Sequence, residues 1–321
     1  MPLIRRHEMW RKSYRLNRDL DHLSPEMLSE RIFDCINNLR VRTEQGQLGL
    51  LPPEKGEDWM VWMTEVLEEC VLRGYPYPGP IDISGFAFVL ENAFKPIPSI
   101  GAVIQKHGLA NRHYLIKFGD PKWLRLALES GKFLISPASF YEKVEHNHAR
   151  RDEELTRLIM PNPRDPRLPA FLSAQNPAVP PGKRVDSIVI KAQLDYYPFS
   201  LSAAYSSRLF GDFNASGCLV IHNPSLFIGK LTDTINKRLC GWESRKGFIT
   251  YYDPVRVDPS VVEVCYFKPF RHAYQKEMRL TWTPPPGSLA LDRFEVEIGP
   301  LHDCAELVDL ESHPPGEARG M

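Results

Sequence analysis

The spacing of hydrophobic positions divides the chain into a helical first part and a later part built from short strands. Up to residue 108, apolar residues recur at helical spacing, most clearly over 25–39 and 57–72. Beyond it, 113–118 is predicted to be a strand, and 121–130 a helix that follows an Asp-Pro cap and stops at a glycine. Strands and helices do not alternate regularly, so we expect an α+β fold whose strands are mainly antiparallel.

Changes in composition set the expected domain boundaries. Residues 1–108 form the predicted helical N-terminal region, and residues 109–310 form the predicted α+β domain. Within that domain, 161–182 is so rich in proline that we expect a loop and not part of a sheet. Residues 311–321 have the composition of a flexible tail.

The strand predicted over 277–283 carries the most informative pattern. Its alternation places polar side chains on one face and apolar ones on the other: Glu277, Arg279 and Thr281 against Met278, Leu280 and Trp282. Such a strand can hold a carboxylate rigidly at the edge of a cleft. The alternative is that Glu277 and Arg279 are solvated positions on an edge strand, since charged side chains usually face water.

The balance of charge favours no particular class of charged partner. The chain has 40 Lys and Arg against 40 Asp and Glu, so no overall field attracts it to nucleic acid or membrane. The segment 4–18 is locally basic and places Trp10 and Tyr14 on one helix face. This segment is either a nucleic-acid-binding patch or a solvated helix that packs its aromatic side chains on the body of the protein.

Apolar runs and cysteines indicate the compartment. No run approaches the ~20 apolar residues of a membrane-spanning helix, and no signal-peptide core follows the first residue. The 6 cysteines are scattered and contain no C-x-x-C pair, which argues against a zinc site and suits a reducing environment. We therefore expect a cytoplasmic protein with no membrane partner.

The common catalytic signatures are missing from the sequence. It contains no phosphate-binding P-loop, no G-x-G-x-x-G, no H-E-x-x-H and no G-x-S-x-G. A metal-dependent nucleic-acid hydrolase would need His148, Asp152 and Glu277 to converge on one ion. Their expected helix and strand settings make that convergence unfavourable, so we predict no metal site.

Four segments resemble, in this order, a pattern found in prokaryotic proteins. They run from Lys117-Phe118-Gly119-Asp120 to Ser139-Phe140-Tyr141, from Ser200 through Gly211-Asp212-Phe213 to Phe227, from Tyr252-Asp253 through Phe267-Lys268-Pro269 to Arg279, and from Val296 to Leu307. Together they cover about 112–308 and are similar to DUF2971-type domain families and related ADP-ribosyltransferase-like proteins, including phage-defence toxins. The resemblance implies an ADP-ribosyltransferase-like, mainly antiparallel split β-sheet domain whose cleft binds NAD.

The same resemblance implies three sites on strands of this domain. The adenosine side of NAD would be contacted by His113 or Lys117, and the nicotinamide side would be supported by Ser136 or Tyr141. The late-strand catalytic residue would be Glu277, which matches the family pattern most closely.

The chemistry of NAD cleavage agrees with a glutamate at this position. Breaking the nicotinamide–ribose bond develops oxocarbenium character on the ribose, which a fixed carboxylate stabilises by roughly a few kcal/mol. Glu277 would also serve as a base on an incoming acceptor. Gln275 would orient that acceptor, and Arg279 would either contact a phosphate of NAD or pair with Glu277.

The expected function is NAD-dependent ADP-ribosylation of a macromolecular acceptor, either protein or nucleic acid, by a toxin or defence effector. NAD is then the substrate, and residues 1–108 would bind a regulatory or antitoxin partner. The alternative is a non-catalytic binding or scaffold protein on the same fold.

Overall fold

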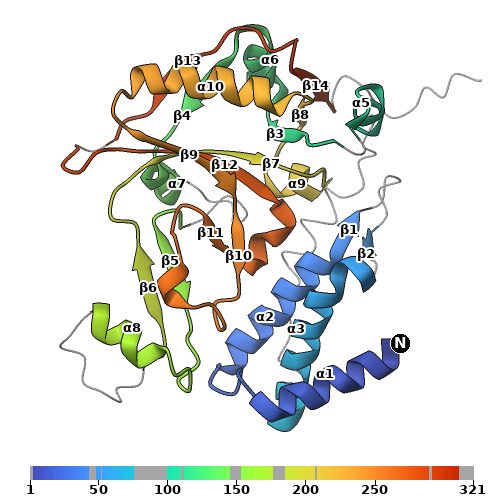
Figure 1. Cartoon of the computed structure of the whole chain (residues 1–321). Helices are drawn as coiled ribbons and strands as arrows, with labels where there is room; N and C mark the ends of the chain where they lie inside the picture. Colours follow the sequence, from blue (N-terminus) through green and yellow to red (C-terminus); the bar gives the residue numbers. More distant parts are fainter. Residues whose placement is uncertain are drawn as a thin grey trace, which may run out of the picture.

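The computed structural model describes residues 3–42, 48–51, 53–75, 100–109, 112–144, 153–175, 185–206, 208–288 and 291–310 (Figure 1). Within these residues, N-terminal helices are followed by a mainly antiparallel sheet and several small two-stranded sheets, which confirms the α+β class. The tail 311–321 and the candidate metal ligands His148 and Asp152 lie outside the described residues. No described helix combines the length and the apolar character needed to cross a membrane.

Three helices dominate the N-terminal part: α1 (Leu3–Asn17), α2 (Pro25–Leu39) and α3 (Pro53–Leu72). The Ser24 side chain accepts a hydrogen bond from the backbone N–H of Met27, which caps α2 at its predicted start. A short hairpin of β1 (Arg40–Arg42) and β2 (Leu48–Leu50) follows α2, and α5 (Ile100–Lys106) precedes the sheet.

The basic segment 4–18 lies on α1 and faces α3. Tyr14 is buried and donates a hydrogen bond to Glu69, while Arg11 and Arg15 pair with Glu68 and Arg18 pairs with Glu69. Part of the basic charge of α1 is therefore neutralised within the protein, which favours the packed helix over the nucleic-acid patch.

The central sheet has six strands in the order β14-β8-β3-β7-β12-β9, and every neighbouring pair is antiparallel. The strands are β3 (Leu115–Gly119), β7 (Tyr197–Ser202), β8 (Gly217–Ile221), β9 (Glu243–Phe248), β12 (Glu277–Thr283) and β14 (Ala305–Asp309). Strand β3 pairs with β8 over its whole length but with β7 only where Ile116 faces Ser202. The sheet consequently opens between β3 and β7.

Each face of the sheet is covered by other elements. Helices α6 (Pro121–Ser130) and α10 (Pro224–Arg238), together with the paired strands β4 (Lys132–Ile135) and β13 (Phe294–Glu297), lie on one face (Figure 1). They enclose the largest core cluster, which includes Phe227, Leu280 and Trp282. Helix α5 and the short helix α9 (Arg208–Asp212) close a second cluster around Ile116 and Val220.

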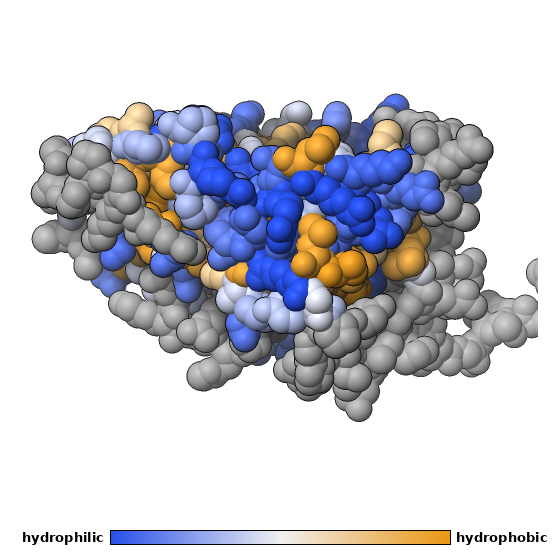
Figure 2. Space-filling model, turned by 90° about the horizontal axis from the view of Figure 1, so that it is seen from below, coloured by the Kyte–Doolittle hydropathy of each residue, from blue (hydrophilic) through white to orange (hydrophobic). Residues whose placement is uncertain are grey.

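Smaller elements pack below the sheet in the view of Figure 1. These are α7 (Ala138–Val144), the antiparallel pair β5 (Thr156–Ile159) and β6 (Ile188–Lys191), α8 (Leu168–Gln175), and the parallel pair β10 (Thr250–Tyr252) and β11 (Phe267–Pro269) with the short 3-10 helices η2 (Pro259–Val261) and η3 (Phe270–Gln275). Figure 2 shows the molecule from this side, where the surface is largely hydrophilic and the hydrophobic residues form small separate patches.

The proline-rich stretch 161–182 is not entirely the loop that its composition predicted. Its described part contains α8, in which Pro169 is the second helical residue. A proline is tolerated in the first turn of a helix because the N–H that it lacks has no partner within the helix there.

Candidate active site

A cavity of about 790 Å³ lies at the opening between β3 and β7. Its walls come from these two strands, from α6, α7, β4 and β11, and from the start of β12. The volume falls within the range of about 300–1,000 Å³ that is usual for sites of small molecules and cofactors. Four of the residues singled out by sequence line it: Lys117, Tyr141, Gln275 and Glu277.

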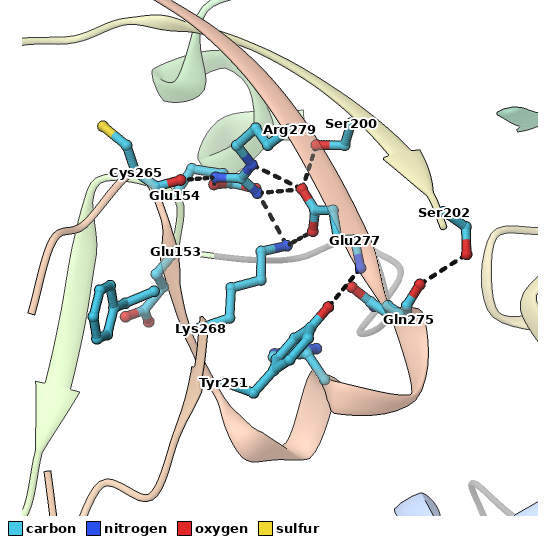
Figure 3. Close-up of polar contacts among 12 residues, drawn as sticks. Glu153, Glu154, Ser200, Ser202, Tyr251, Cys265, Lys268, Gln275, Glu277 and Arg279 are labelled. Atoms are coloured by element: carbon cyan, nitrogen blue, oxygen red, sulfur yellow. Dashed lines mark hydrogen bonds and ion pairs between the residues drawn. The ribbon is translucent and has the colours of Figure 1, made fainter. Parts of the chain in front are cut away.

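Glu277 is the first residue of β12, and its carboxylate is held on both oxygens. Oε1 accepts hydrogen bonds from the Ser200 hydroxyl and, at 2.7 Å, from Nε of Arg279, while Oε2 lies 2.8 Å from Nζ of Lys268 (Figure 3). Its backbone N–H donates to the Tyr251 hydroxyl at 2.8 Å. Glu277 is only 5% exposed, so its position in the wall of the cavity is rigid.

A second carboxylate completes this buried network. Glu154, from the turn before β5, accepts hydrogen bonds from Nη1 and Nη2 of Arg279 at 2.7 and 3.0 Å, and lies 3.7 Å from Lys268. The side chain of Arg279 is completely buried. Arg157 on β5 is also buried and lies 3.7 Å from Glu154. The two carboxylates are therefore surrounded by three cations, and buried charges need such partners.

The network keeps Glu277 ionised. Burial raises the pKa of the Glu277 carboxyl, but the charges of Arg279 and Lys268 outweigh that effect, and the pKa lies well below its ordinary value of 4.5. A carboxylate of such low pKa is a weak base at neutral pH. A carboxylate in this state can stabilise positive charge and accept hydrogen bonds.

This low pKa makes the contribution of Glu277 to stability depend on pH. The unfolded chain binds a proton at Glu277 more readily than the folded one, so the contribution is present above pH 4.5 and is lost as the pH falls towards the folded pKa. We expect the difference in unfolding free energy between wild type and Glu277→Gln to shrink between pH 6 and pH 3. Urea unfolding at a series of pH values measures it, and a difference that does not change with pH would contradict the expectation.

The edge-strand interpretation of Glu277 and Arg279 is wrong. Strand β12 pairs with β7 on one side and with β9 on the other, and both of its faces are buried. Its polar face is covered by β11 and by the turn that carries Glu154. Of the two roles predicted for Arg279, the structure shows the pairing with Glu277. Arg279 does not line the cavity.

The other predicted residues occupy different settings. Lys117 donates to the backbone oxygen of Ser200 at 3.0 Å, across the opening between β3 and β7, and lies 4.6 Å from the ring centre of Phe199. His113 was expected on the first strand, but β3 begins only at Leu115, and His113 is exposed outside the cavity lining. Ser136 is buried just after β4, because the chain turns there into α7, and it does not line the cavity either.

Several residues of the network were not singled out by sequence, namely Glu154, Arg157, Ser200 and Lys268. Ser200 and Lys268 lie inside the segments that carry the resemblance, and Glu154 is the last residue of the charged run 150–154. No spacing rule identifies them, because they come from different strands and turns.

The described residues contain no cluster of three or more His, Cys, Asp or Glu side chains placed to hold a metal ion. Comparisons of the chain with protein-family models, with curated proteins and with solved structures found no match. The resemblance to ADP-ribosyltransferase-like proteins thus rests on the sequence segments alone.

Proposed function

We propose that the cavity binds NAD and that the protein transfers its ADP-ribose to a macromolecular acceptor. The observation that carries this proposal is the ionised carboxylate of Glu277, which is fixed in the wall of a cavity of suitable size. A fixed negative charge is what the cleavage of the nicotinamide–ribose bond needs, because positive charge develops on the ribose.

The proposed reaction uses Glu277 as an electrostatic group. The electrons of the broken bond remain on the nicotinamide nitrogen, which makes nicotinamide a neutral leaving group. An oxygen or nitrogen atom of the acceptor forms the new bond to the ribose, and its proton passes to water. Glu277 accepts a hydrogen bond from the ribose and stays ionised throughout, while Arg279 and Ser200 keep its carboxylate in place.

Other parts of the cavity suit the remainder of a dinucleotide. Lys117 brings positive charge to its lining, which favours phosphate groups, whereas the charge of Lys268 is taken up by its ion pair with Glu277. Phe133 and Phe199 contribute aromatic surface, and Trp123 on α6 lines the cavity although it is 61% exposed. An exposed tryptophan of this kind provides a face on which a base stacks.

A second candidate function is nucleotide binding without transfer. It is supported by the engagement of both Glu277 oxygens with Arg279, Lys268 and Ser200, because catalysis would require one of these contacts to yield to the ribose. Three further predictions follow from the resemblance alone. They are a macromolecular acceptor, a role as a toxin or defence effector, and a regulatory partner at residues 1–108.

The test combines nicotinamide release with NAD binding. Purified protein is incubated with cell lysate and with NAD labelled in the ADP-ribose part, and free nicotinamide and labelled macromolecules are both measured. We expect release and labelling by the wild type, and release slowed roughly 100-fold or more in Glu277→Gln. Circular dichroism establishes that the variant is folded.

A second variant changes an exposed residue, so that a loss of NAD binding cannot be explained by misfolding. Trp123→Ala removes an exposed ring, and we expect it to weaken NAD binding about tenfold, measured by calorimetry, without unfolding the protein. Binding of NAD by the wild type without release of nicotinamide would support the second candidate. If the wild type neither binds NAD nor releases nicotinamide, both candidates are wrong.

A further inference from the structure

Helix α2 of the N-terminal region contacts the segment that carries the site. The 3-10 helix η3 joins β11, which carries Lys268, to β12, which begins at Glu277. Figure 1 shows η3 beside α2, and Asn38 makes the contact. The Asn38 amide nitrogen donates to the backbone oxygen of Phe270 at 2.9 Å, and its oxygen accepts from the backbone N–H of Tyr274 at 2.9 Å. One side chain therefore ties down both ends of η3.

The first residue of η3 is held by further contacts from the helices. The ring of Phe270 packs against the rings of Trp59 and Trp62 of α3, with ring centres 5.9 and 4.9 Å away. The guanidinium of Arg31 on α2 lies 5.1 Å from the same ring and makes a buried ion pair with Asp253, with Nη1 and Oδ1 2.7 Å apart. These contacts fix the position of η3 against α2 and α3.

The last residues of η3 lead directly into the site. Arg208 lies 3.5 Å from the ring centre of Tyr274 and donates to the backbone oxygen of Asn37 at 2.6 Å. The Ser202 hydroxyl donates to the backbone oxygen of Gln275, and Lys276 then adopts a positive φ of 45° before the strand begins at Glu277. The turn at Lys276 is tight, so a displacement of Tyr274 is passed on to Glu277.

We propose that Asn38 is a positioning residue for the site, through which the N-terminal helices set the places of Gln275, Glu277 and Lys268. Without the Asn38 amide, the oxygen of Phe270 and the N–H of Tyr274 are buried with no side-chain partner, which favours local opening of η3. Both members of the Lys268–Glu277 ion pair lie next to η3 in the chain, so opening of η3 displaces both. The catalytic part of this proposal rests on the proposed function.

The test compares Asn38→Ala with Asn37→Ala. Asn37 is the preceding residue of α2 and is also buried, but its side-chain oxygen accepts from Arg40, and within the described residues its side chain makes no hydrogen bond to η3. Hydrogen exchange of the peptide covering 270–278 is measured without NAD. We expect faster exchange at Tyr274, Glu277 and Met278 in Asn38→Ala, and exchange close to that of the wild type in Asn37→Ala.

The kinetics of nicotinamide release distinguish a positioning role of Asn38 from a purely structural one, because a purely structural role would leave kcat unchanged. We expect kcat to fall roughly 10- to 100-fold in Asn38→Ala, because small misplacements of reacting groups have effects of this size. KM should change less than about threefold, since Lys117 and Trp123 lie on other elements, and Asn37→Ala should keep both constants.

The outcomes separate this proposal from the proposed function. Exchange over 270–278 that is equal in Asn38→Ala and wild type overturns the positioning role, whatever the activity. Faster exchange with an unchanged kcat also overturns it, because η3 then does not position Glu277. If the wild type releases no nicotinamide, the proposed function fails. The positioning role is tested independently of activity: it is overturned if Asn38→Ala speeds hydrogen exchange at Tyr274 but not at Glu277 and Met278.

Discussion

Replacing Arg279 by methionine is expected to lower the unfolding free energy by roughly 3–5 kcal/mol at pH 7. The arginine donates hydrogen bonds to both Glu154 and Glu277, and its side chain is completely buried. Methionine fills similar space without charge, so both carboxylates lose the guanidinium that donates hydrogen bonds to them, and Lys268 and Arg157 remain as ion-pair partners. Buried carboxylates that lose such hydrogen bonds cost far more stability than a lost surface contact does. Urea unfolding followed by tryptophan fluorescence measures the change.

The neighbouring strand offers a matched control. Arg245 on β9 pairs with Glu263, but both side chains are more than a third exposed. Solvent screens such a pair, and Arg245→Met should cost less than about 1 kcal/mol. The cost of Arg279→Met should also diminish on acidification, because the Glu277 carboxyl, whose pKa Arg279 helps to lower, then takes up a proton. Equal costs for the two variants would show that the buried network contributes no more than a surface ion pair.

Local features of the fold were predictable from the sequence. The bounds of α2 and α6 follow from Ser24 and Asp120, whose side chains accept hydrogen bonds from the first turns of these helices, and from Gly131, which ends α6. Strand β12 has the bounds that its alternation predicted. Caps, terminating glycines and period-two alternation act over a few residues, which is why a single sequence reveals them.

The setting of the site was not predictable in the same way. Glu277 looked solvated because its alternation is typical of a half-buried strand, but Glu154 and Lys268 cover that face. Glu154 lies more than 120 residues from Arg279 in the chain, and no local pattern reports such a contact. The opening between β3 and β7 depends on pairing between strands that are also distant in sequence, so it became visible only in the structure.

Gly131→Ala is expected to destabilise the protein by roughly 2–5 kcal/mol, through two separate effects. Gly131 ends α6 with a φ of +71°, a conformation that costs an alanine about 1–2 kcal/mol. A Cβ at this position would also lie 2.2 Å from the backbone oxygen of Gly299 and 2.7 Å from Cγ1 of Ile298. Overpacking against a backbone that cannot move freely adds about 1–3 kcal/mol.

Gly287 isolates the second effect, because it has a similar φ of +84° but, its chain neighbours apart, no heavy atom of the described residues within 4 Å of a Cβ. Gly287→Ala should therefore cost only about 1–2 kcal/mol, and the excess for Gly131→Ala measures the close approach of Gly299. Since Gly131 joins α6 to β4, and both elements line the cavity, the same variant should also weaken NAD binding. Thermal unfolding measures the loss of unfolding free energy in both variants. Equal losses would mean that the chain around Gly299 moves away from the new Cβ without penalty, so that α6 and β4 are less rigidly joined than their contacts indicate.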